Sequence, residues 1–86
     1  MALYLPESRS LKNKRQVINS LKERLHNRFN LSVAEVGDNE LWQRCQLAMA
    51  IVANAHAHAD SVLSKAVNFI EGDMRVQILD YGLEER

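Results

Sequence analysis

The sequence predicts an α+β domain in which a four-stranded antiparallel sheet is covered on one face by two helices. Two long segments, 11–29 and 54–71, repeat apolar residues with the period of a helix. Four short segments rich in apolar or β-branched residues flank these helices. The chain has 86 residues, which fits a single domain over 1–86, because two domains of half that length would each bury too small a core.

The first strand is expected at 2–5, where Leu3 and Leu5 alternate with Tyr4. Pro6 ends this strand because proline has no N–H to give to a sheet.

The first helix is expected at Leu11–Phe29, with Ser10 as the N-cap whose hydroxyl accepts a backbone N–H. Asn30 suits the left-handed residue that ends many helices. At about 100° per residue, the apolar side chains of this segment fall within one third of the circumference. They are Leu11, Val17, Ile18, Leu21, Leu25 and Phe29.

The second strand is expected at 31–36, and the sequence Gly-Asp-Asn-Glu at 37–40 marks a turn. The third strand is expected at 45–53, where successive apolar residues point to opposite faces. Asn54 can cap a second helix that runs to Glu71, and the fourth strand is expected at 74–81.

This order, β-α-β-β-α-β, is that of a ferredoxin-like sandwich with strand order 4-1-3-2 and both helices on one face. The alternative is a three-helix arrangement in which 47–59 is helical. It would leave the strand signals at 31–36 and 76–79 without a sheet to join.

The helix-free face of this sheet is expected to be small and apolar, whereas an open sheet face normally alternates to polar residues. A short first strand also leaves backbone groups of its neighbours unpaired. Both features indicate a homo-oligomer, most simply a dimer, that packs through this face. The residues expected there are Tyr4, Ala34, Ala48, Ala50 and Val52.

The formal net charge is zero, but the charge is segregated along the chain. Residues 1–30 hold seven basic and two acidic residues, whereas residues 31–86 hold four basic and nine acidic ones. This asymmetry suits either an anionic partner such as RNA or the pairing of unlike faces in an oligomer.

The first helix carries the candidate RNA-binding surface, in which cations border the apolar stripe and gather near the helix start. Lys14 falls inside the stripe, so its ammonium is expected to emerge at the end of the domain. The alternative is that these side chains cover apolar surface with their methylene stems. The candidate nucleic-acid-binding residues are Arg9, Lys12, Lys14, Arg15, Lys22 and Arg44.

Trp42 precedes Arg44 in a loop, and two interpretations are open. The indole covers one end of the core, which we favour because of its large apolar area. Otherwise it stacks on a base or holds a protein partner. Arg44 is a candidate ion-pair partner of Glu35 or Glu40.

Two strings of this sequence resemble a known family. They are RSLKNKRQVINSLKERLHNRFNLSVAEV at 9–36 and LWQRCQLAMAIVAN at 41–54, and they resemble the YlxP-like family of small bacterial proteins of unknown function. The resemblance implies a ferredoxin-like fold and a bacterial cytoplasmic setting. The genes of this family often lie beside genes for ribosome maturation, which implies ribosomal RNA or a ribosomal subunit as a partner.

No catalytic constellation is apparent, so the protein is expected to be a binding protein rather than an enzyme, without a cofactor or metal. His56 and His58 are two residues apart, and on a helix such a pair points in opposite directions. Cys45 is expected to be a small buried residue. No apolar run approaches the roughly 20 residues that span a bilayer, so no membrane partner is expected.

Overall fold

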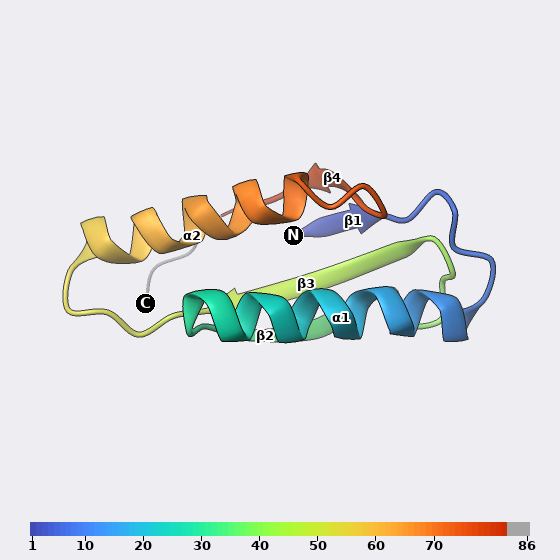
Figure 1. The fold of residues 1–86 in the computed structure, drawn as a ribbon, viewed down its shortest axis with the longest axis horizontal. Coiled ribbons are helices and arrows are strands. Elements are labelled where there is room, and N and C mark those ends of the chain that lie inside the picture. The colour runs from blue at the N-terminus through green and yellow to red at the C-terminus, as the bar shows by residue number, and fades with distance from the viewer. Residues whose placement is uncertain (83–86) are drawn as a thin grey trace.

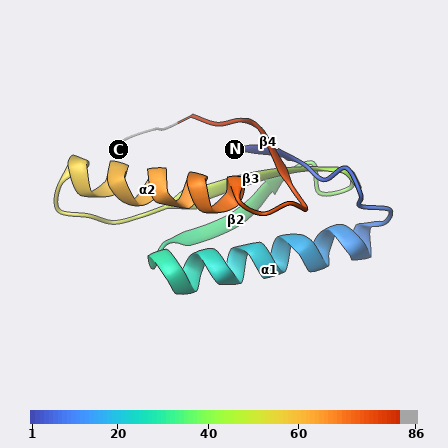
Figure 2. The same cartoon turned by 45° about the horizontal axis from the view of Figure 1, so that its top comes forward.

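The structure is a computed structural model that describes residues 1–82, apart from the side chain of His56. Its elements in chain order are β1 (Ala2–Tyr4), α1 (Leu11–Phe29), β2 (Ser32–Gly37), β3 (Arg44–Ala50), α2 (His56–Glu71) and β4 (Gln77–Asp80). The sheet is antiparallel with the order β2-β3-β1-β4, and both helices lie on one face (Figure 1, Figure 2). The ferredoxin-like prediction is confirmed, and the three-helix alternative is wrong because 44–50 is a strand.

The core lies between the sheet and the two helices. The inward residues of β1 and β3 alternate with outward ones, as the period of a strand requires. The apolar stripe of α1 joins these inward strand residues in one buried cluster. The buried cluster is Leu3, Leu5, Ile18, Leu21, Leu25, Leu31, Cys45, Leu47, Ala66, Ile70 and Val76.

The predicted caps of α1 are confirmed. The Ser10 hydroxyl accepts the N–H of Asn13 at 3.0 Å, and the Asn13 side-chain oxygen accepts the N–H of Arg9 at 3.3 Å. Asn30 ends the helix in the left-handed region with φ of 52°. The cap predicted for α2 is wrong, because the N-cap is Ala55 rather than Asn54 and no side chain caps this helix.

The third strand is shorter than predicted, because β3 ends at Ala50, opposite Ser32 of β2. The chain beyond Ala50 has no strand partner and turns toward α2. Val52 is therefore 101% exposed outside the sheet, and its predicted place on the open sheet face is wrong.

Candidate nucleic-acid interface

Lys14 is buried, so its predicted place on an RNA-binding surface is wrong. The residue is 1% exposed. Its Nζ lies 3.0 Å from Oε2 of Glu35 and donates a hydrogen bond of 2.6 Å to the carbonyl of Asp38. Lys14 belongs to the apolar stripe of α1 and Glu35 to the inward side of β2, so the two charges neutralise each other inside the fold.

This ion pair positions the loop between β2 and β3. The carbonyl of Asp38 accepts two hydrogen bonds, one from the Lys14 ammonium and one of 3.0 Å from the N–H of Leu41. Asp38 has a φ of 59°, so the turn begins in the left-handed region. Lys14 therefore holds the loop that carries Trp42 against α1.

Cys45 lies beside the same pair, with its Sγ 3.6 Å from Oε2 of Glu35. Burial, followed by the negative charge of Glu35, raises the pKa of the Cys45 thiol to about 12. The thiol is thus neutral at physiological pH, and its predicted role as a small buried residue is confirmed.

Gln43 joins two loops at the end of the domain where α1 begins. Its side-chain amide nitrogen donates to the carbonyls of Pro6 and Ser8, each at 3.2 Å. Its own carbonyl accepts the N–H of Leu5 at 2.8 Å. These bonds fix the β1–α1 loop against the segment that leads into β3, and Figure 1 shows both at the same end.

Four exposed cations and an exposed indole lie at this end of the domain, and we call this set the tryptophan surface. Lys12 and Arg15 lie on α1 at the covered side of the sheet, whereas Arg44 lies on the open face. Trp42 is 55% exposed, so the favoured interpretation of it as a lid over the core is wrong. Its members are Arg9, Lys12, Arg15, Trp42 and Arg44, and all five are exposed.

Among the ion pairs of residues 1–82, none involves a cation of the tryptophan surface. Arg44 lies opposite Tyr4 on the open face of the sheet, whereas Glu35 faces inward to Lys14. Arg44 does not pair with Glu35 as suggested.

Lys22 lies further along α1 and is partly buried. Two exposed acids, Glu7 and Glu40, occupy the same two loops, so the local positive excess is small.

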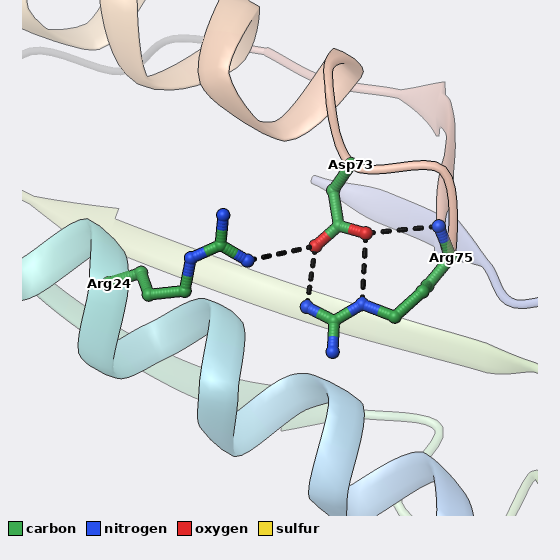
Figure 3. A network of polar contacts seen from close by, with 3 residues as sticks. All are labelled: Arg24, Asp73 and Arg75. Carbon is green, nitrogen blue, oxygen red and sulfur yellow. Dashed lines mark hydrogen bonds and ion pairs between the residues drawn. The ribbon is translucent and has the colours of Figure 1, made fainter.

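A second charged cluster, which sequence reasoning missed, links α1 to the loop after α2 (Figure 3). Arg75 donates to both carboxylate oxygens of Asp73, at 2.7 and 3.0 Å, and Arg24 lies 3.6 Å from the same carboxylate. The hydrogen bonds from Arg75 hold the pKa of Asp73 below its ordinary value. The Arg24 guanidinium also lies 5.1 Å from the centroid of the Phe69 ring. Arg24 is therefore engaged within the molecule.

The open face of the sheet has the predicted apolar character in its centre. Ala34 and Ala48 lie directly opposite each other and are exposed, as is Ala50. Tyr4 is half-buried at one side of this face. Val36 adds an apolar side chain that is 61% exposed.

The family described as "Protein of unknown function (DUF503)" matches residues 1–82. The chain belongs to this family. A relative from Bacillus subtilis (strain 168), described as "Uncharacterized protein YlxP", is 34% identical over 62 residues. That alignment covers 72% of this chain and 67% of the relative. The resemblance inferred from the sequence is thus confirmed.

Neither α1 nor α2 is both long and apolar enough to cross a membrane. Within the part of the chain that the structure describes, no three or more His, Cys, Asp or Glu residues gather as a metal site would require.

Proposed function

We propose that this protein binds structured RNA through the tryptophan surface, with ribosomal RNA or a ribosomal subunit as the partner. The observation that carries the proposal is the pair of hydrogen bonds from the Gln43 side chain to the carbonyls of Pro6 and Ser8, which we call the Gln43 clamp. It holds the loop of Arg9 beside the segment of Trp42 and Arg44, and the Trp42 side chain is more than half exposed.

The residue types of this surface suit RNA. Lys and Arg neutralise phosphates without reading sequence, and an exposed indole stacks on an unpaired base of a loop or bulge. An exposed tryptophan is otherwise costly, because a large apolar area stays in water. The sheet face is a poorer candidate for base stacking, since its alanines offer no ring.

The test is binding to a fluorescently labelled RNA hairpin, followed by anisotropy at several salt concentrations. Lys12→Glu with Arg15→Glu is expected to abolish binding, because the two new carboxylates repel the phosphates that the cations would contact. Both side chains are exposed, so the core should stay intact. Ser61→Glu with Ser64→Glu is the control, since it adds negative charge at two exposed positions of α2, away from the tryptophan surface.

Two results would contradict the proposal. One is wild-type affinity that does not fall as salt rises, because phosphate contacts release counterions. The other is an equal loss of affinity, per unit of negative charge added, in the control and the α1 variant, which would mean that only net charge matters.

The second candidate is self-association through the open face of the sheet. A hollow of about 580 Å³ also opens beside Met1, between the edge of β3 and α2. It is lined by Leu47 and Met49 of β3, Leu63 and Val67 of α2, and Tyr81 after β4. The pairing of β1 with β3 ends where Met1 and Leu47 exchange two hydrogen bonds of 2.8 and 2.9 Å. The remainder of that edge of β3 is a place where another strand can add.

Light scattering tests this candidate. Ala48→Glu places a carboxylate in the centre of the sheet face and is expected to convert a dimer into a monomer. Ala57→Glu, at an exposed position of α2, is the matched control and is expected to keep the dimer. A wild-type monomer, or a dimer that survives Ala48→Glu, contradicts this candidate.

A further inference from the structure

A hollow of about 550 Å³ opens at the end of the domain opposite the tryptophan surface, where α1 ends and α2 begins. The two sites are separated by the length of α1, whose 19 residues span about 28 Å. We call this hollow the basic pocket. Its apolar lining comes from Phe29, Ile51, Val52 and Val62, and its polar lining from Arg28, Asn30, His58 and Lys65. Most of the lining residues are exposed, so the hollow is open to solvent along one side.

Three segments form the pocket, namely the end of α1, the chain that follows β3, and α2. Asn30 ends α1 in the left-handed region, which turns the chain at the rim of the hollow. Because β3 ends at Ala50, Ile51 and Val52 leave the sheet and reach the same place. On α2, the spacing i, i+4, i+7 puts His58, Val62 and Lys65 on one face of the helix.

The charge of the lining favours an anion. Arg28 and Lys65 are cations, His58 offers an imidazole nitrogen, and none of the described lining residues is acidic. The first turn of α2 holds no acidic residue and Ala55 supplies no side-chain cap, so the positive end of this helix is not screened by its own chain.

Arg28 is held ready for such a ligand. Its guanidinium lies 5.6 Å from the ring centroid of Phe29 and 5.4 Å from that of Phe69. Stacking on two rings restricts the side chain, and its planar donors suit the oxygens of a phosphate. The adjoining apolar wall can receive a flat ring next to the anion.

We propose that the basic pocket binds a nucleoside phosphate. The phosphate lies between Arg28 and Lys65, with His58 as a further donor. The base lies against Phe29 and Val62, where the side-chain amide of Asn30 can reach its polar edge. This site does not depend on the RNA-binding proposal, because the two sets of residues are at opposite ends of α1.

The test uses adenosine 5′-diphosphate as the probe, with adenosine and inorganic phosphate as separate arms, and follows backbone amide shifts by NMR. The diphosphate is expected to shift amides at 28–30, 51–52 and 58–65, whereas adenosine alone is expected to bind far more weakly. Lys65→Gln is expected to weaken binding about tenfold. Lys12→Gln, at the other end of α1, is the matched control and is expected to leave the affinity unchanged.

Val52→Glu provides a second variant, since this fully exposed side chain can be changed without touching the core. A carboxylate there is expected to repel the phosphate and abolish binding. Three results would overturn the proposal: no shifts at millimolar diphosphate, shifts confined to the tryptophan surface, or inorganic phosphate that binds as tightly as the diphosphate. The last would show that the pocket makes no use of the nucleoside.

Discussion

The two ends of α1 carry similar residue types but present them differently. At the tryptophan surface, the aromatic side chain projects into solvent, with Trp42 55% exposed, and the cations lie on the β1–α1 loop, on the first turns of α1 and at the start of β3. At the basic pocket, the aromatic side chain is Phe29, which packs on the core and forms a wall of a hollow. A projecting ring suits a base displayed by a polymer, whereas a hollow suits a ligand small enough to enter it.

The difference arises from what fixes each region. The tryptophan surface is shaped by polar contacts, namely the buried Lys14–Glu35 pair and the Gln43 clamp. The basic pocket is shaped by where α1 and β3 end and by apolar packing. A change to Lys14 should therefore affect the first region and leave the pocket's own lining in place.

The largest expected effect is the loss of the buried ion pair. Lys14→Met is expected to reduce the free energy of unfolding by about 3–5 kcal/mol, because it leaves the partly buried Glu35 without its partner. Urea denaturation measures this, with Lys12→Met as the exposed control, for which a change within about 0.5 kcal/mol is expected.

A double variant sharpens this prediction. Lys14→Met with Glu35→Leu removes both charges and is expected to recover most of the lost stability, because no buried charge then stays unpaired. If the single variant lost less than about 1 kcal/mol, the pair would not fasten the loop as described.

The next effect concerns the exposed indole, which is the one tryptophan of the chain and so gives a fluorescence signal of its own. RNA is expected to quench this signal on binding. Trp42→Ala is expected to cost about 1–3 kcal/mol of binding free energy, whereas Trp42→Phe, which keeps a ring, should retain most of it. Unquenched fluorescence at saturating RNA would place the contact elsewhere.

A smaller effect is expected for Asp73→Asn, which weakens the contact between the loop after α2 and Arg24 of α1. Because the pKa of Asp73 is lowered in the folded protein, its ionised form stabilises the fold above the ordinary value of 3.8, and this contribution disappears as pH falls through the folded pKa.

The stability difference between wild type and Asp73→Asn should accordingly be about 1 kcal/mol at neutral pH and vanish in acid. Thermal unfolding at neutral and acid pH measures it. A difference that grows as pH falls would contradict the assignment.

The smallest effect concerns the acids within the tryptophan surface. Glu40→Gln removes an exposed carboxylate from the loop of Trp42 and is expected to raise RNA affinity about twofold at low salt. Glu71→Gln, an exposed acid of α2, is the control and is expected to raise it less. Equal gains would indicate a contact without a fixed place on the protein.

The fold could be predicted because periodicity identified both helices and all four strands, and the caps of α1 agreed with its periodicity. The range Leu11–Phe29 was predicted to the residue, since Ser10 and Asn30 bound it with side-chain and backbone conformations that suit those positions. The end of β3 was missed because the apolar alternation continues past Ala50, while β2 begins only at Ser32 and cannot pair further.

The candidate site was harder to predict, because contacts between distant segments decide it. Lys14 lies in the inward stripe of α1 and Glu35 in phase with the inward residues of β2, so the sequence did hold a signal for their pairing. Trp42 gave no such signal, since a loop has no periodicity from which the exposure of a side chain can be predicted. The basic pocket could not be predicted without knowing that β3 ends at Ala50, because this end brings Ile51 and Val52 into its lining.

The most direct test of the central claim is the salt dependence of RNA affinity in two single variants. For a phosphate contact at the tryptophan surface, Lys12→Gln should lower the slope of log affinity against log salt by about 0.7–0.9. Arg75→Gln, at a cation that already pairs with Asp73, should leave the slope unchanged. Equal slopes for wild type and Lys12→Gln, or a lower slope only in Arg75→Gln, would contradict the account.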